Sequence, residues 1–202
     1  MLRGRHFALS GLLVLLAACL LAGCQSQPKW QLDNVQGHMP DLQFRMTNDL
    51  GQPVTAATYG GKVVMLYFGY THCPDVCPLT MAHLHSVLQK LGKKIASHVQ
   101  VLFVTVDPAR DTVPVIHQYV TAFDPRFVGL RGNNNSLNAL TKRYRAIFQI
   151  EKPIPANGDY LVTHSSAIYI FGPKGDIRLL AAPGATVSAM VHDVRILVEQ
   201  TT

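Results

Sequence analysis

The sequence is poor in charge and in cysteine. Only 15% of its 202 residues are charged, and the net charge of +6 comes from basic residues that are spread thinly along the chain. Because nucleic-acid-binding surfaces need clustered basic side chains, we expect no nucleic-acid partner. The sequence has no internal repeat, and an apolar content of 48% is typical of a globular protein, not of a disordered or collagen-like one. A series of long apolar runs is also lacking, which excludes a polytopic membrane protein, and the length suffices for one domain with a packed core.

The long uncharged run of the sequence lies near its N-terminus, after a short basic segment with Arg3 and Arg5. It extends from Phe7 to Pro28 and includes Leu21-Ala22-Gly23-Cys24. A basic start, an apolar stretch and small residues before a cleavage point are typical of a secretory signal. The last four residues also match the lipobox of bacterial lipoproteins, in which Cys24 becomes the lipidated first residue. A retained single-span anchor is the alternative, because the run is nearly long enough to cross a bilayer.

Both interpretations place the rest of the chain outside the cytoplasm and attached to a membrane. The lipoprotein interpretation divides the chain into a signal peptide (residues 1–23), a lipidated cysteine with its tether (24–40) and a folded domain (41–202). We therefore predict a membrane-anchored lipoprotein of the bacterial cell envelope that faces the periplasm.

Strand and helix patterns alternate through the domain. Strands are expected at residues 62–68, 99–106, 127–130, 166–171 and 176–180, the last two joined by the turn Gly172-Pro173-Lys174-Gly175 as a β-hairpin. Helical spacing of apolar residues marks four further segments, of which the first ends at Gly92 and the others are capped by Thr112, Ser136 and Thr186.

This order predicts an α/β protein with a central, mostly parallel sheet, helices on both faces and a C-terminal β-hairpin. It is the thioredoxin-like layout, with additional N-terminal strands between Leu42 and Thr58.

Two cysteines remain for the domain, because Cys19 lies in the signal and Cys24 takes the lipid. Cys73 and Cys77 stand where the first buried strand ends and the first helix begins. Asp75 as helix N-cap would place Cys77 in the first turn, where the helix dipole favours a thiolate. Three interpretations are open: a structural disulfide, thiol–disulfide exchange with three intervening residues instead of the usual two, and a metal site formed by thiolates.

A metal site needs at least one more ligand, and His164 is the candidate. It lies in the segment that enters the hairpin, which in a thioredoxin-like fold packs beside the N-terminus of the first helix. Two thiolates and one imidazole suit copper, since sulfur holds Cu(I) and nitrogen helps to accommodate Cu(II). From its position alone, a single histidine entering a strand is more often structural than a ligand.

Other polar residues are expected to play supporting parts. Asp107, Arg110 and Asp111 follow the end of the second buried strand, and we interpret them as an Arg–Asp clamp that fixes the loop. The remaining histidines of the domain are not expected to be ligands: His72 diverges from Cys73, His83 and His85 are solvated helix positions, and His98, His117 and His192 have no partner at ligand spacing.

Three segments together resemble the Sco/SenC family of membrane-tethered copper proteins with a thioredoxin fold. They are Tyr67-Phe-Gly-Tyr-Thr-His-Cys-Pro-Asp-Val-Cys-Pro78, Val106-Asp-Pro-Ala-Arg-Asp-Thr112 and Tyr160-Leu-Val-Thr-His-Ser165, within a resemblance that runs from about Leu42 to Leu197. The resemblance implies that Cys73, Cys77 and His164 bind copper, as Cu(I) or Cu(II). One departure is Thr163, where many members carry an acidic residue that would support the imidazole.

The resemblance further implies a metallochaperone that delivers copper to the copper centre of cytochrome c oxidase or a similar exported copper protein. Its partners would be the copper-accepting subunit, a copper donor protein and the membrane that holds the lipid anchor. The alternative is a thiol–disulfide oxidoreductase that keeps the cysteines of such a copper site reduced, with Cys73 and Cys77 as the redox pair. Thioredoxin-type oxidoreductases place a proline before the hairpin, where this chain has Thr163-His164-Ser165-Ser166, so a chaperone is favoured over an enzyme.

Overall fold

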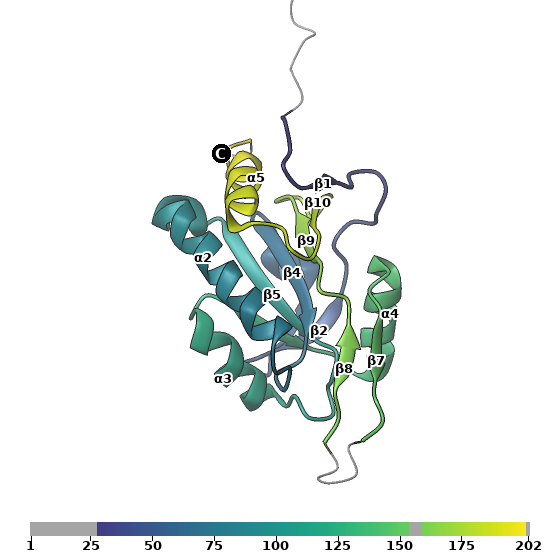
Figure 1. Cartoon of the computed structure of the whole chain (residues 1–202). Coiled ribbons are helices and arrows are strands. Elements are labelled where there is room, and N and C mark those ends of the chain that lie inside the picture. The colour runs from purple at the N-terminus through teal and green to yellow at the C-terminus, as the bar shows by residue number, and fades with distance from the viewer. Residues whose placement is uncertain (1–27, 154–158, 201–202) are drawn as a thin grey trace, which may run out of the picture.

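The centre of the fold is a parallel three-stranded sheet. The computed structural model describes residues 28–153 and 159–200 (Figure 1). In it, β4 (Val63–Gly69) and β5 (Val99–Thr105) pair in parallel over their whole length, and β6 (Val128–Arg131) extends the sheet beside β5. All residues of β4 and β5 are buried, which confirms the strands expected from the continuous apolar runs.

Antiparallel strands extend the sheet on both sides. The order is β1-β10-β9-β4-β5-β6-β2-β3, with the remaining strands at β1 (Asp33–Asn34), β2 (Arg45–Asn48), β3 (Pro53–Thr55), β9 (Ile168–Phe171) and β10 (Ile177–Ala181). The thioredoxin-like layout, the C-terminal hairpin and the additional N-terminal strands are confirmed. The expectation of a mostly parallel sheet holds for β4, β5 and β6 only, because the strands added on both sides pair antiparallel. Of these pairs, β2–β3 and β9–β10 are joined by short turns, which require antiparallel pairing.

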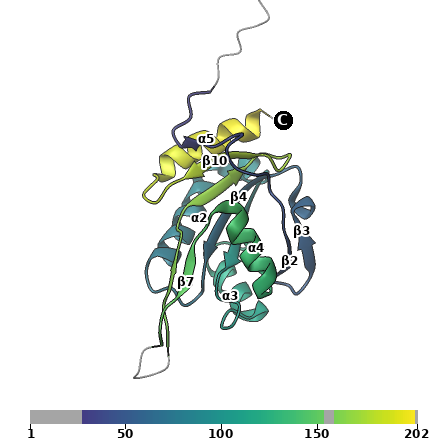
Figure 2. The same cartoon turned by 90° about the vertical axis from the view of Figure 1, so that its right-hand side faces the viewer.

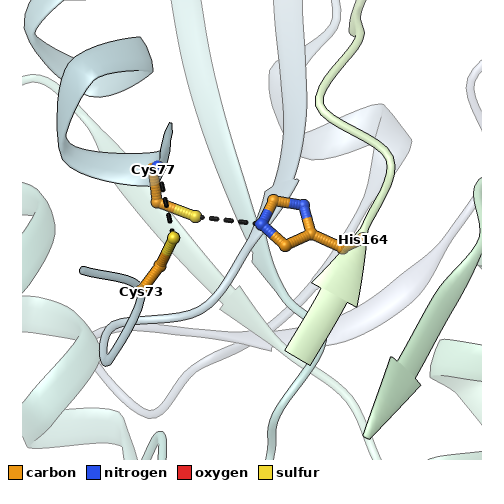
Figure 3. Close-up of side chains that lie close together, drawn as sticks. All are labelled: Cys73, Cys77 and His164. Carbon is orange, nitrogen blue, oxygen red and sulfur yellow. Dashed lines mark hydrogen bonds between the residues drawn. The ribbon is translucent and has the colours of Figure 1, made fainter. Parts of the chain in front are cut away.

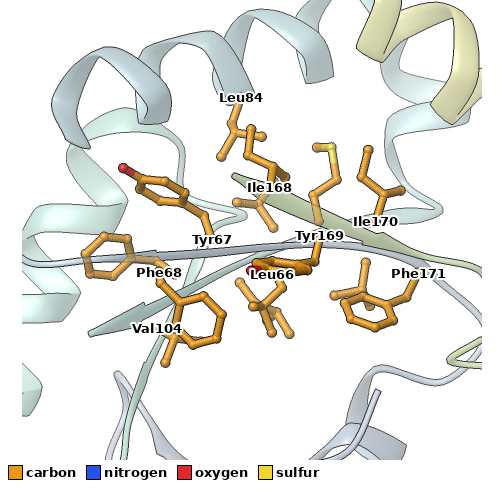
Figure 4. Close-up of a cluster of buried hydrophobic side chains, with 14 of the residues drawn as sticks. Leu66, Tyr67, Phe68, Leu84, Val104, Ile168, Tyr169, Ile170 and Phe171 are labelled. Carbon is orange, nitrogen blue, oxygen red and sulfur yellow. The ribbon is translucent and has the colours of Figure 1, made fainter. Parts of the chain in front are cut away.

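In the described part of the chain, four α-helices cover the two faces of the sheet. They are α2 (Val76–Ala96), α3 (Val113–Phe123), α4 (Asn134–Tyr144) and α5 (Val187–Glu199), and a 3-10 helix, η1, covers Ala56–Tyr59. Helices α2, α3 and α5 lie on one face and α4 lies on the other (Figures 1 and 2). The side chains of β4 and β9 alternate between these faces, with Tyr67 and Ile168 toward α2 and Phe68 and Tyr169 away from it (Figure 4).

The predicted helix ends hold with one correction. Thr112 and Thr186 precede α3 and α5, and the Thr186 side chain accepts a hydrogen bond from the N–H of Ala189. The prediction that Ser136 caps α4 is wrong: Asn133 is the cap, and its side chain accepts from the N–H of Ser136. Asn is as good a cap as Ser, and Asn133 starts the helix one turn earlier. Gly92 has a φ of +76° and interrupts α2, but one more helical turn follows it.

Part of the expected tether lies against the domain. Strand β1 pairs with β10, and the N–H groups of Gln31 and Leu32 both donate to the buried carboxylate of Asp193 on α5. The expected signal peptide (1–23) and Cys24 lie outside the described residues. Within residues 28–153 and 159–200, none of the helices combines the length and the apolar character that crossing a membrane requires.

Candidate metal centre

The structure brings Cys73, Cys77 and His164 together. Cys73 lies in the loop after β4, Cys77 in the first turn of α2, and His164 at the end of β8 (Val162–His164), so the three come from two sides of one small space (Figure 3). Their ligand atoms all lie within 4.8 Å of one another, and among the described residues no other group of His, Cys, Asp or Glu has this arrangement. His164 Nε2 is 3.2 Å from Cys77 Sγ, and the N–H of Cys77 donates to Cys73 Sγ at 3.4 Å. Both cysteines are free thiols.

The close approach of α2 to the sheet depends on Gly69, the last residue of β4. A Cβ atom at this position would lie 2.7 Å from the Phe103 ring and 3.0 Å from Cys77 Sγ. Both distances are shorter than ordinary van der Waals contact, so a larger residue would displace the thiol or the ring. The glycine therefore determines how deeply Cys77 is buried. Cys77 is 0% exposed.

A short hairpin that the sequence did not predict positions His164. It pairs β7 (Phe148–Ile150) with β8, and His164 lies opposite Phe148. Strands of three residues are too short to show a clear alternation, which is why the pattern was missed. The hairpin follows α4 in the chain and brings His164 to the first turn of α2, where its Nε2 lies 3.2 Å from Cys77 Sγ.

The imidazole of His164 is held in an orientation that suits a ligand. Its Nδ1 is 3.0 Å from the carbonyl oxygen of Ser165, an acceptor, so Nδ1 carries the hydrogen and Nε2 presents its lone pair to the sulfurs. The rings of Tyr67 and Tyr70 contact it edge-on, with centroids 6.1 and 5.8 Å away. Burial lowers the pKa of His164, which keeps the imidazole neutral.

The expectation that the helix N-terminus favours a thiolate is not met at Cys77. Burial raises the pKa of the Cys77 thiol to about 12, and the hydrogen bond from the Tyr67 hydroxyl, at 3.5 Å, only partly opposes this. Desolvation of a buried charge outweighs the helix dipole here, since the dipole contributes about 1 kcal/mol or less at most sites. Without metal, Cys77 is therefore a protonated thiol.

The junction between β5 and α3 supports the cysteine loop. The Arg–Asp clamp is confirmed, since Arg110 Nε is 2.5 Å from Asp107 Oδ2. The Arg110 guanidinium also lies 3.6 Å above the Tyr160 ring and 5.7 Å from Tyr70, which in turn contacts His164. The clamp thus connects the loop before the cysteines to the segment that carries the histidine.

Asp111 provides a second connection between the two junctions. Its buried carboxylate accepts hydrogen bonds from the backbone N–H and the hydroxyl of Thr71, at 3.0 and 2.6 Å, and from the hydroxyl of Thr105. Thr71 lies two residues before Cys73, so these bonds fix the start of the cysteine loop.

Four other histidines of the described chain lie beside carboxylates instead of joining the site. His85 Nδ1 is 2.9 Å from buried Asp124, so the prediction that His85 is only a solvated helix position is wrong. His72 lies near Asp111, and His117 and His192 pair with Asp49 and Asp193. Thr163, at the position where an acidic residue was expected, donates its hydroxyl to the Glu151 carboxylate at 2.9 Å, so a negative charge lies one residue from His164.

Comparisons with known proteins show the family of the chain. The SCO1/SenC family model matches residues 35–199. A putative copper-binding protein of Stutzerimonas stutzeri is 32% identical over 177 residues, which cover 83% of each protein. The mitochondrial protein SCO2 of Saccharomyces cerevisiae is 37% identical over 132 residues, covering 65% of this chain and 44% of the yeast protein. The chain thus spans about half the length of the mitochondrial relatives that it matches.

Solved structures give the same result. Arabidopsis thaliana ScoI with copper bound is 31% identical with a TM-score of 0.72, over 79% of this chain and 98% of that one. Apo Sco1 of Thermus thermophilus is 32% identical with a TM-score of 0.73, over 85% of this chain and 99% of that one. A SCO1/SenC family lipoprotein of Bacillus anthracis is 25% identical with a TM-score of 0.64, over 78% and 94%. Because the family model covers most of the chain and these structures share its thioredoxin-like fold, the chain belongs to the SCO1/SenC family.

Proposed function

We propose that this protein is a copper metallochaperone that binds one copper ion through Cys73, Cys77 and His164. The observation that carries the proposal is the convergence of two thiols and one neutral imidazole within 4.8 Å. Thiolates select soft ions such as Cu(I), and the imidazole helps the site to accommodate Cu(II). Several relatives support copper as the ion, since a structure of Arabidopsis ScoI holds copper and the Stutzerimonas protein is named as copper-binding.

The copper is cargo, and the site is built to take it up and release it. Cys73 is 9% exposed and Cys77 is 0% exposed, so an incoming ligand reaches the ion from the Cys73 side. A thiol or imidazole of the partner replaces one protein ligand at a time, so that no free ion is released. Each thiol that binds copper gives up its proton. When the partner's ligands take the ion, the two cysteine thiolates of this protein are protonated again.

The recipient we propose is the copper-accepting subunit of cytochrome c oxidase or another exported copper protein, supplied through a copper donor protein. We further propose that the chain is attached to a membrane through lipid on Cys24 and faces the periplasm. The lipobox-like sequence before Cys24 supports the anchor, as does the lipoprotein of Bacillus anthracis among the structural neighbours.

The test is a Cu(I) titration of the reduced protein under anaerobic conditions, with His164→Ala as the variant and Thr163→Ala as the matched control. Thr163 is the neighbour of His164 on β8 but is exposed and bonds to Glu151. We expect one tightly bound equivalent in the parent and the control, and clearly weaker binding in His164→Ala.

Unchanged binding in His164→Ala would remove the histidine from the site and leave a dithiol. The oxidoreductase hypothesis would then be favoured, and it predicts turnover of a disulfide substrate that does not depend on His164.

A further inference from the structure

Exposed apolar side chains gather on the two segments that carry the metal ligands. Seven large apolar side chains are exposed in the part of the chain that the structure describes, and five of them lie on these segments. They are Val76 and Leu79 on α2, and Ile147, Ile150 and Leu161 on or beside the β7–β8 hairpin. Exposed apolar groups that cluster around a site mark a surface for another molecule, whereas scattered ones are ordinary.

The α2 side of this region is a groove next to Cys77, with a volume of about 310 Å³. One wall is a stripe of α2 at helical spacing: Val76, Leu79, Thr80 and His83. The other walls are the start of β9, with Ser166 and Ile168, and the loop from Ala182 to Thr186 between β10 and α5.

The groove and the metal centre share their framework. Cys77 belongs to the neighbouring stripe of α2, which points into the core with Met81 and Leu84, while Val76 faces the groove. On the opposite wall, Ser166 follows His164 by two residues. The groove therefore lies beside the metal centre and is built on the same two segments, α2 and the chain that follows His164.

The chemistry of the groove defines the kind of surface that it fits. The residues that line it include no Asp, Glu, Lys or Arg, and its polar members are Thr80, His83, Ser166 and Thr186. A second groove, of about 830 Å³ on the α4 side of the sheet, has the cations Arg45, Lys62, Arg143 and Lys174 in its lining. A neutral, largely apolar surface therefore matches this groove better than one that carries phosphate or carboxylate groups, which bind most strongly to cations.

We propose that the uncharged groove between α2, β9 and the β10–α5 loop is the docking surface for the protein that exchanges copper with this site. The partner inserts an apolar side chain that contacts Leu79 and stands next to the partner's own copper ligands. This inference rests on the proposed function and adds how the partner is recognised. A small apolar contact around one central residue gives the short-lived complex that a carrier needs, because such interfaces depend on a few buried anchors.

The experiment compares copper transfer to a protein with copper transfer to a small chelator. The Cu(I)-loaded protein is mixed with the apo copper domain of a cytochrome c oxidase subunit, and separately with bathocuproine disulfonate. The variants are Leu79→Ser and the conservative Leu79→Met, with Leu50→Ser as the matched control. Leu50 is 64% exposed and Leu79 is 54% exposed, but Leu50 lies in the β2–β3 turn, away from the groove.

We expect Leu79→Ser to slow transfer to the protein acceptor by about fivefold or more at subsaturating concentrations, the effect of losing one interface anchor. Transfer to the chelator should not change, because a small molecule does not dock in the groove. Leu79→Met and Leu50→Ser should both behave like the parent.

Three outcomes would overturn the inference. Parent-like transfer from Leu79→Ser to the acceptor would show that the groove does not dock it, while equal slowing toward the chelator would trace the effect to the metal centre. A parent that binds copper but transfers none to the acceptor would overturn the proposed function together with the groove's role in it.

Discussion

The two strand-to-helix junctions at the carboxyl edge of the sheet are neighbours with opposite chemistry. Strands β4 and β5 run in parallel, so the junctions β4–α2 and β5–α3 emerge side by side. At the first, the N–H of Cys77 and the Tyr67 hydroxyl lie 3.4 and 3.5 Å from the sulfurs of Cys73 and Cys77, and Cys77 Sγ lies 3.2 Å from His164 Nε2. At the second, the carboxylates of Asp107 and Asp111 accept hydrogen bonds from arginine, tyrosine and threonine side chains and from the backbone N–H of Thr71. The sulfurs of the first junction are available to bind an external ion, whereas the carboxylates of the second junction form hydrogen bonds and ion pairs that stabilise the fold.

The comparison separates the residues that bind copper from the residues that hold the cysteine loop in position. Asp111 holds Thr71, and Arg110 contacts the Tyr70 ring, so the second junction fixes the backbone of the first. A substitution of a cysteine should therefore lower the affinity for copper and leave the free energy of unfolding nearly unchanged. A substitution of a carboxylate should lower the free energy of unfolding and affect the copper affinity less.

The largest effect is expected from Cys77→Ser. Replacing a soft sulfur with a hydroxyl removes one of three ligands, so we expect the affinity for Cu(I) to fall on the order of a hundredfold or more. The measurement is a competition titration against a Cu(I) chelator. The control is Thr112→Ala in the second junction, whose side chain makes no capping bond and whose loss should leave the affinity unchanged. Retained affinity in Cys77→Ser would break the distinction between the junctions.

The next effect concerns stability and compares two aspartates. Asp111→Ala leaves the N–H and hydroxyl of Thr71 and the hydroxyl of Thr105 without their acceptor, and we expect a loss of about 3 kcal/mol in the free energy of unfolding. Asp75→Ala is the control, because Asp75 is exposed and makes no capping bond at the start of α2, so its loss should cost less than about 1 kcal/mol. Urea denaturation measures both, and equal losses would contradict the comparison.

The third prediction uses the protonated state of Cys77. With a pKa of about 12, this thiol is protonated at neutral pH and must lose its proton to bind copper. Because His164 has a lowered pKa, its imidazole is already neutral and competes for no proton. We therefore expect the apparent affinity for Cu(I) to rise by about tenfold or more per pH unit between about pH 6 and pH 8. A smaller slope would mean that the free protein already holds a thiolate.

Most of the fold followed from the sequence, because the buried strands and amphipathic helices leave local patterns. Residues 62–68 and 99–106 are apolar without interruption, and no other element type fits them between turn signals. The cysteine pair was visible from its place between a strand and a helix. His164 was identified through the family resemblance, since a single histidine carries no local pattern.

Other features depend on contacts between distant residues, which no local pattern encodes. Cys77 is deeply buried beside Gly69, which leaves room for the sulfur, and this burial reverses the expected effect of the helix dipole. The pairing of His85 with Asp124 joins residues 39 positions apart. The β7–β8 hairpin is similar, because its short strands are held by pairing with each other and by no periodicity of their own.

The smallest effect is a difference within the first junction itself. Cys73 is 9% exposed, whereas Cys77 is 0% exposed and has a raised pKa, and alkylation requires an accessible thiolate. We therefore expect iodoacetamide to modify Cys73 about tenfold faster than Cys77 in the reduced, copper-free protein, as measured by mass spectrometry of the two modified forms over time. Urea should abolish the difference, because both thiols are then exposed, and bound Cu(I) should protect both. Equal rates in the folded protein would mean that α2 opens readily at its first turn. The site would then be a mobile dithiol and lose its contrast with the rigid junction beside it.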